Sequence, residues 1–562
     1  KKIFSKNKPA SSPERKLYLH LPPVREFFAK HKIYSLVLLL LIVVTYANAI
    51  GGDFVSDDRG IILNPEFLTW EFAATRSIFV IRPILYFIIG HVFGLHPAPF
   101  HILNIFFHAG TVLTVFMLLS TFVGVSVAFS AAAIFAVHPA ISEAVTWISG
   151  GGYVQYSFFL LGSLLFYILH ASQKRSKYLY ASYVAAVLSA LSGDRGILPF
   201  IVLLYVLLFE QIKTAWKRII PYFIIAGSFI AYYLSLVGTR IASVQHEQFM
   251  ESTILDPRLQ IPTAISTYLE ILVWPSSLTF YYSDFVMTDW VYALRIAVLV
   301  VCAVLAYITF RWFKQLFFWI AIFLLALAPT LTPWGLSSIV NERYGYLSSI
   351  GFILLVVYVA WNLWGNNKKT EVIYYILLTS VIAGLSIRTI IRNRDYRNED
   401  TLWVATGKTA VYSPVTHMNL GDMHRRHKNF SEAEREFENA LILNPNNGYA
   451  LYNLGLTYQE AEAYEAAITT YTESLKRDPG LWQAHQNMGV IYVKLREVEL
   501  AEAAFAKAIE LGSDNPGVFA NLAYVYMATG KLEQAQHVLN EAFTRFPNSP
   551  QLQEAQASLK VQ

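Results

Sequence analysis

The chain has 562 residues, of which 55% are hydrophobic, 15% aromatic and only 15% charged, and its formal net charge is +5. Soluble globular chains carry about 25% charged residues and disordered chains are poor in aromatic residues, so this composition excludes both classes. The positive charge does not indicate a nucleic-acid partner, because Lys and Arg lie in short loops between apolar runs, as in membrane proteins. The single cysteine, Cys302, excludes an intrachain disulfide.

The first part of the chain reads as a polytopic membrane domain. Residues 1–32 form a basic arm, and the apolar run that follows is expected to stay as an uncleaved anchor. About eleven runs up to residue 391 approach the ~17–25 residues that a spanning helix needs. They are 33–50, 100–120, 123–138, 153–170, 178–192, 196–210, 219–237, 291–310, 316–331, 346–364 and 371–390. The runs 82–94 and 262–282, the latter broken by Pro275, are interpreted as interfacial or re-entrant.

The loop charges fit eleven spans. With this count every basic loop falls on one face, which the positive-inside rule makes cytoplasmic. The opposite, extracytoplasmic face receives the longer loops and the whole C-terminal part. Those loops are 51–99, 139–152, 238–290 and 332–345.

A change in composition near residue 392 marks a second domain. We expect a linker helix over 392–412, four helical repeats over 413–548 and a cap over 549–562. The repeats have a period of 34 residues, seen in Asn419, Asn453, Asn487 and Asn521 and in Ala433, Ala467, Ala501 and Ala535. This period and its small residues are typical of tetratricopeptide repeats, which stack into an α-solenoid with a concave groove. The fold class is therefore all-α.

The extracytoplasmic loops contain the candidate catalytic groups. The acids are Asp57, Asp58 and Glu143, and the candidate phosphate-binding residues are Arg82, Arg195, Arg240, Arg343 and His138. A carboxylate can deprotonate a hydroxyl nucleophile. Arginines hold phosphate through bidentate, charge-assisted hydrogen bonds. Acids and arginines at one face of a membrane thus suit a reaction on an anionic lipid headgroup.

Each of these groups also has a purely structural interpretation. Asp57 and Asp58 could belong to a solvated loop or cap a helix, and Glu143 could cap a helix that begins near Ser142. Arg343 could pair with Glu342. His138, which precedes a proline, could simply end a helix.

The asparagines of the repeats are candidate acceptor-binding residues. Asn419, Asn453, Asn487 and Asn521 recur at one position of the first helix of each repeat, which lines the concave groove. An amide can pair with the backbone N–H and C=O of an extended peptide. The alternative is that these amides bond to the neighbouring repeat and stabilise the stack.

Several separated motifs resemble one family. The string Gly52-Asp53-Phe54-Val55-Ser56-Asp57-Asp58-Arg59, followed by Asn64-Pro65, is similar to the first luminal loop of the transmembrane and tetratricopeptide-repeat O-mannosyltransferases. Further matching segments are Arg82-Pro83, His96 to Asn104, His138-Pro139, Glu143-Ala144-Val145 and Glu342-Arg343-Tyr344. The chain departs from the family pattern at Gly150-Gly151-Gly152 and at Gly193-Asp194-Arg195.

The resemblance implies a C-type glycosyltransferase fold and an inverting transfer of sugar from a polyprenyl-phosphate carrier. It places the base on Asp57 or Asp58, and we favour Asp58 because Arg59 would lie close by. No obligatory metal is expected, although Asp57, Asp58 and Glu143 could also bind a divalent ion. Few repeats and a single cysteine favour a bacterial member.

The sequence therefore predicts a multi-pass enzyme, in the bacterial plasma membrane rather than the endoplasmic reticulum. Its repeats lie on the extracytoplasmic side. It transfers a monosaccharide such as mannose from a polyprenyl-phosphate donor to Ser or Thr of a polypeptide held by the repeats. One alternative acceptor is a glycolipid or a surface polysaccharide. A different class is a non-catalytic scaffold or a transporter, although transporters place ionisable groups near the membrane midplane.

Overall fold

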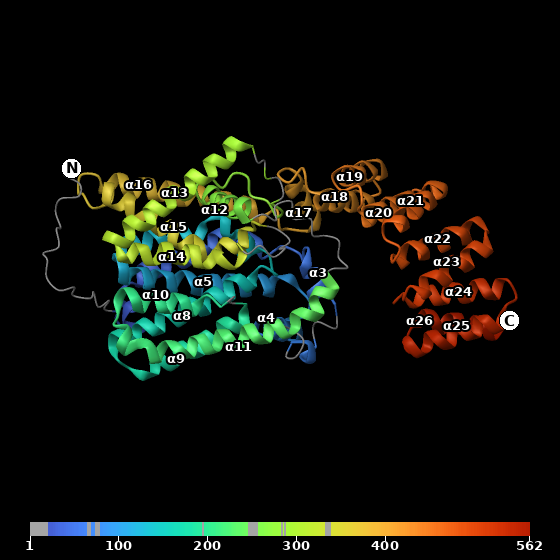
Figure 1. Ribbon diagram of the computed structural model, residues 1–562, viewed down its shortest axis with the longest axis horizontal. Helices are drawn as coiled ribbons and strands as arrows, with labels where there is room; N and C mark the ends of the chain where they lie inside the picture. Colours follow the sequence, from blue (N-terminus) through green and yellow to red (C-terminus); the bar gives the residue numbers. More distant parts are fainter. Residues whose placement is uncertain are drawn as a thin grey trace. The chain divides into compact units, whose positions relative to one another are not determined.

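A computed structural model describes residues 21–64, 69–73, 79–193, 196–244, 257–282, 285, 288–331 and 339–561. It shows helices joined by turns and loops, which confirms the predicted all-α class (Figure 1). The chain divides into two compact units, residues 1–405 and 406–562.

Unit 1 contains the apolar part of the sequence. Its helices are α1 Val24–Lys30, α2 Lys32–Tyr46, α3 Asp57–Ile62, α4 Ile81–Phe93, α5 Pro97–Val123, α6 Val125–Val137, α7 Ser142–Thr146, α8 Gly151–Gln173, α9 Ser176–Ser192, α10 Leu198–Phe209, α11 Ile212–Val244, α12 Pro257–Val273, α13 Asp289–Trp312, α14 Lys314–Leu327, α15 Gly345–Ala360 and α16 Glu371–Asn393. The short α17, Glu399–Gly407, follows α16 and crosses the division between the units.

Each predicted span lies on a helix, but the helices differ in length. Seven stretches of the described chain are long and apolar enough to cross a membrane, or eight if the bent pair α6 and α7 forms one span. α9, α10 and α14, with 17, 12 and 14 residues, fall short of that length. The chain is a multi-pass membrane protein, and the count of eleven spans stays a prediction. The interfacial run 262–282 ends its helix at Val273, just before Pro275.

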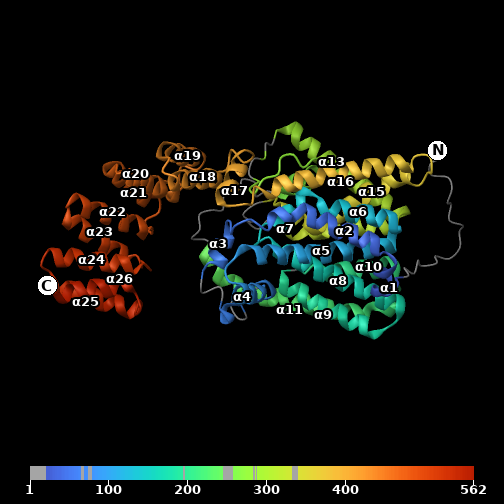
Figure 2. The same cartoon turned by 180° about the vertical axis from the view of Figure 1, so that it is seen from behind.

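The long helices of unit 1 run in alternating directions, so their connections gather at two opposite ends (Figure 2). At one, which we call the polar end, Asn393 Nδ2 of α16 donates to Thr45 O of α2 (2.9 Å) and Thr146 Oγ1 of α7 donates to Asn393 Oδ1 (2.7 Å). At the other, which we call the basic end, Gln173 Nε2 of α8 donates to Leu21 O (3.1 Å).

The basic loops within the described residues gather at the basic end. There the ring of Phe122, at the end of α5, lies 5.6 Å from that of Phe209 in α10 and 5.4 Å from that of Phe318 in α14. The basic residues in and beside the loops at this end are Lys174, Arg175, Lys177, Lys213, Lys217, Arg218, Arg311 and Lys314. The candidate acids therefore lie at the end of the helix bundle that is opposite to the Lys- and Arg-rich loops.

Unit 2 is a tetratricopeptide-repeat solenoid of paired helices. These are α18 Pro414–Arg426, α19 Phe430–Leu443, α20 Gly448–Glu460, α21 Tyr464–Arg477, α22 Trp482–Leu495, α23 Val498–Glu510, α24 Pro516–Ala528, α25 Leu532–Arg545 and α26 Pro550–Val561. The small residues let the helices of each pair approach closely: a Cβ on Gly489 would lie 2.7 Å from the ring of Phe505. Leu552 and Ala555 of α26 pack against Phe519 and Leu539 and cover the last repeat.

Candidate active site

Asp58 is a buried acid at the start of α3. Its Oδ1 accepts hydrogen bonds from Ser149 N (2.8 Å) and Ser149 Oγ (2.5 Å), and its Oδ2 accepts one from Val55 N (3.2 Å). Burial raises the pKa of this carboxyl to about 7, against the lowering effect of these hydrogen bonds. The side chain is inaccessible to solvent and its two oxygens already have partners in the protein.

Asp57, the preceding residue, has an exposed side chain. Adjacent residues at a helix start point in different directions, so only one of the two acids can face a substrate. Arg59, which we expected to lie beside an inward-facing Asp58, is exposed as well. The choice between the two acids as the base stays a prediction; Asp57 is the accessible carboxylate and Asp58 the buried one.

The turn of residues 147–150 connects the polar side chains of this end. The Ser149 carbonyl, on the same residue that binds Asp58, accepts a hydrogen bond from Arg82 Nη1 (2.8 Å). Asn104 Nδ2 donates to Trp147 O (3.1 Å), and Trp147 Nε1 donates to Val55 O (3.2 Å). The turn therefore fixes the first loop and Arg82 relative to each other.

Arg343 is held by Glu143, not by its neighbour Glu342. Glu143 is fully buried; one carboxylate oxygen accepts from Arg343 N (2.9 Å), and the other forms an ion pair with Arg343 Nη1. The Arg343 guanidinium lies 5.1 Å from the Trp147 ring centre and 5.2 Å from that of Tyr344. Its side chain stays 16% exposed.

Tyr281 is affected by the charges of both the accessible acid, Asp57, and Arg343. Its side chain is half-buried, and its hydroxyl interacts electrostatically with both Arg343 and Asp57. Burial is the largest cause of the raised pKa of Tyr281, while Arg343 lowers it and Asp57 raises it. Asp57 and Arg343 thus act in opposite directions on the pKa of Tyr281.

Glu342 forms a second buried ion pair that the sequence did not reveal. Its Oε1 accepts from Arg392 Nη2 (2.8 Å), and both side chains are at most 1% exposed. Arg392 Nη1 also pairs with Asp395 Oδ2 (2.9 Å). Arg392 follows an apolar run of α16, where a basic residue reads as a membrane-flanking charge, so no sequence signal pointed to this role.

The remaining predicted phosphate ligands are placed differently. His138 has a structural role, because its Nε2 bonds to Leu272 O (3.0 Å) and its Nδ1 accepts from Ala140 N (3.2 Å), so neither ring nitrogen is available for a phosphate. Arg195 lies outside the described residues. Arg240 belongs to α11 and not to the loop expected there, and its side chain is not among those described. Of the predicted phosphate ligands whose side chains the structure describes, Arg82 and Arg343 lie beside the 147–150 turn.

The asparagines of the repeats do not share one environment. Asn487 Nδ2 donates to the hydroxyls of Tyr452 (3.2 Å) and Tyr471 (3.1 Å) in the preceding repeat, which is the stabilising alternative. Asn419 Nδ2 donates to Val415 O of its own helix (2.8 Å). A role in peptide binding stays a prediction for Asn453 and for Asn521, which lines a cavity between α22 and α24.

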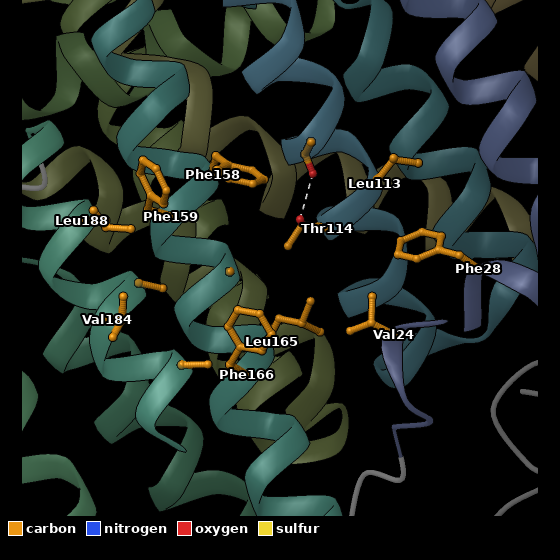
Figure 3. A pocket seen from close by; sticks show the side chains of 14 residues that line it. Val24, Phe28, Leu113, Thr114, Phe158, Phe159, Leu165, Phe166, Val184 and Leu188 are labelled. Carbon is orange, nitrogen blue, oxygen red and sulfur yellow. Dashed lines mark hydrogen bonds between the residues drawn. The ribbon is translucent and has the colours of Figure 1, made fainter. Parts of the chain in front are cut away.

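The apolar cavities between the described helices of unit 1 include two large ones. The first, of about 560 Å³, is bounded by α1, α5, α8 and α9, and its only polar side chain, Thr114, bonds to Gly110 O (Figure 3). The second, of about 380 Å³, lies between α12, α13, α14 and α15. α15 begins two residues after Arg343, so the second cavity shares an element with the site.

Sequence comparisons agree with this architecture. The tetratricopeptide-repeat models match residues 418–481, 456–516 and 492–559. A protein O-mannosyl-transferase of Caenorhabditis elegans is 25% identical over 73% of this chain and 62% of its own length. Protein O-mannosyl-transferase Tmtc2 of Drosophila melanogaster is 33% identical over 19% of this chain and 11% of its own, and TMTC3 of Mus musculus is 29% identical over 24% and 14%. The chain thus spans less than two thirds of the length of the curated relatives it matches.

Among solved structures, MamA is 23% identical over 25% of this chain and 78% of its own, with a TM-score of 0.24. The tetratricopeptide-repeat protein YrrB is 18% identical over 34% of this chain and 95% of its own, with a TM-score of 0.25.

Proposed function

Because this chain is a relative of the protein O-mannosyltransferases, with tetratricopeptide repeats after its membrane helices, we propose that it is a membrane O-glycosyltransferase. It transfers a monosaccharide from a polyprenyl-phosphate donor to Ser or Thr of an extracytoplasmic polypeptide. The observation that carries this proposal is the cluster of groups at the polar end: the exposed Asp57 carboxylate, Arg82 bonded to the Ser149 carbonyl, and Arg343 held by Glu143.

In this reaction Asp57 acts as the general base. It takes the proton of the acceptor hydroxyl as the oxygen attacks the anomeric carbon. The bond between that carbon and the phosphate oxygen breaks on the opposite side, so the configuration at the anomeric carbon inverts. The proton stays on Asp57, and the bonding pair leaves with the lipid phosphate.

Two arginines stabilise the leaving phosphate. Arg343 is fixed by Glu143 and by the rings of Trp147 and Tyr344, and its side chain stays partly exposed. Arg82 is fixed on the Ser149 carbonyl. Hydrogen-bond donors that are already oriented need no rearrangement as charge develops on the leaving phosphate. We propose that these arginines suffice and that no metal is obligatory.

The apolar cavity near the site and the repeats would each hold one of the two substrates. We propose that the hydrocarbon chain of the carrier enters the apolar cavity between α12 and α15, and that the repeats hold the acceptor polypeptide. The polar end then faces the extracytoplasmic side, since the Lys- and Arg-rich loops lie at the other end.

The test is transfer of mannose from polyprenyl-phosphate mannose to a set of Ser- and Thr-containing peptides by the full chain in nanodiscs. Asp57→Asn is expected to lower turnover ~100-fold or more. The matched control is Asp53→Asn, since Asp53 is an exposed acid of the same loop and is expected to tolerate the change. Transfer that occurs to glycolipid but to no peptide would redirect the proposal to the alternative acceptor. Unchanged turnover in Asp57→Asn would refute the assigned chemistry.

A further inference from the structure

Ser56, which directly precedes Asp57, has a backbone conformation that few side chains adopt. Its φ is 53° and its ψ is −127°. Glycine occupies this region freely, whereas other residues are strained there and persist only where the surroundings hold them. Since Asp57 follows at once, the torsions of Ser56 decide the direction in which the proposed base points.

The group that holds Ser56 is 343 positions away in the sequence, near the C-terminal boundary of unit 1. Ser56 N donates a 2.7 Å hydrogen bond to Glu399 Oε2, in the first turn of α17. The other carboxylate oxygen, Oε1, accepts a 2.6 Å hydrogen bond from Trp403 Nε1. The two oxygens of the Glu399 carboxylate thus accept from different donors, the Trp403 indole and the strained Ser56 peptide.

Two residues that precede Ser56 in the chain are also hydrogen-bonded to the segment that precedes Glu399. Asp53 N donates to Arg397 O (2.8 Å), and Asn48 Nδ2 donates to Ile390 O (2.8 Å). The segment 390–399 is therefore bonded to residues 48–56 at several places. A bond to a carboxylate is stronger than these neutral bonds, so Glu399 is the principal restraint on Ser56.

We propose that Glu399 is a positioning residue that sets the direction of the base Asp57 by holding the strained backbone of Ser56. The inference rests on the proposed function, because it assigns to Glu399 the placement of that base. Loss of the bond lets the 55–56 peptide rotate, and a displaced base has a large effect on the chemical step while the substrates still bind.

The experiment measures turnover and peptide-level hydrogen exchange of the full chain in nanodiscs. Glu399→Ala is expected to lower kcat ~10- to 100-fold, with the KM of donor and acceptor within about 2-fold of wild type. Exchange of the peptide covering residues 52–58 rises at the same time. Glu399→Gln keeps one acceptor oxygen and is expected to lie between wild type and Ala.

The decisive variant is Ser56→Gly in the Glu399→Ala background. Glycine adopts the required φ without strain, so the double variant is expected to recover at least about 5-fold of the lost kcat. Trp403→Phe is the matched control, because it removes the other hydrogen bond of the Glu399 carboxylate and leaves the Ser56 bond in place. Its kcat is expected to fall by less than about 3-fold.

The outcomes separate this inference from the proposed function. Wild-type kcat in Glu399→Ala, or a loss that Ser56→Gly does not relieve, overturns the positioning role. The positioning role is overturned by these results even if Asp57→Asn is inactive, an outcome that supports the proposed function. If Asp57→Asn keeps full turnover, the proposed function is refuted. Faster exchange over residues 52–58 in Glu399→Ala, which removes both carboxylate oxygens, then still supports the restraint on Ser56, and unchanged exchange refutes it.

Discussion

The hydroxyl of Ser149 donates a 2.5 Å hydrogen bond to the carboxylate of Asp58, a residue 91 positions earlier in the chain. This contact separates the roles of two adjacent acids. Asp58 binds the turn to which Arg82 also donates a hydrogen bond, whereas Asp57 keeps an exposed carboxylate.

Asp58 makes stability depend on pH. Burial raises its pKa from 3.8 in the unfolded chain to about 7 in the folded protein, so the folded state binds the proton more tightly. Stability is therefore highest below about pH 4 for this group alone and falls as the pH rises toward 7. Between pH 5 and 7.5 we expect the Tm of wild type to fall by a few degrees, and that of Asp58→Asn, which cannot ionise, to change less. A steeper pH dependence in Asp58→Asn would contradict this assignment; the readout is intrinsic fluorescence during heating.

Arg343 is expected to bind the donor phosphate through its planar fork. Lys keeps the charge but loses the bidentate geometry, so donor affinity should decrease in the order wild type, Arg343→Lys, Arg343→Ala. We expect a loss of about 10-fold or more for Ala, measured by binding of a fluorescent polyprenyl-phosphate sugar. Arg59→Ala is the control, since Arg59 is exposed. Equal affinities for all three residues at position 343 would show that the donor binds elsewhere.

Arg392 is expected to matter for stability through Glu342. Arg392→Met leaves the Glu342 carboxylate buried without its partner, which typically costs about 3–5 kcal/mol. The double variant Glu342→Leu with Arg392→Met removes both charges and should recover most of that loss. Chemical unfolding of the three proteins measures the difference. A double variant no more stable than Arg392→Met alone would mean that Arg392 acts through Asp395 or Tyr396.

Asn487 is expected to stabilise the repeats. Asn487→Ala leaves the hydroxyls of Tyr452 and Tyr471 without this partner, at a cost of about 1–3 kcal/mol. Hydrogen exchange of the full chain should show faster opening of α20 to α22. Asn521→Ala, at the same position of the next repeat, is the control. It should leave exchange unchanged and lower transfer to peptides if the cavity beside it binds the acceptor. The reverse pattern would reassign the two asparagines.

Local patterns predicted the fold more completely than the site. The 34-residue period and the apolar runs depend on residues close in sequence, so the repeats and the membrane helices could be expected in advance. The contacts of the site could not, because each joins distant segments: Asp58 with Ser149, Glu143 with Arg343, and Ser56 with Glu399. Which of two adjacent aspartates is buried likewise depends on these contacts and not on the local sequence. His138 shows the opposite case, since its simplest interpretation, the end of a helix, agrees with its backbone hydrogen bonds.

The Ser56–Glu399 hydrogen bond spans 343 positions of the chain. A ribosome releases residue 56 long before residue 399, so for most of its synthesis the first loop lacks the group that holds its strained backbone. A chain that stops before residue 399 would have the proposed base but not its orientation. The order of synthesis thus delays completion of the proposed site until α16 and the start of α17 have been made.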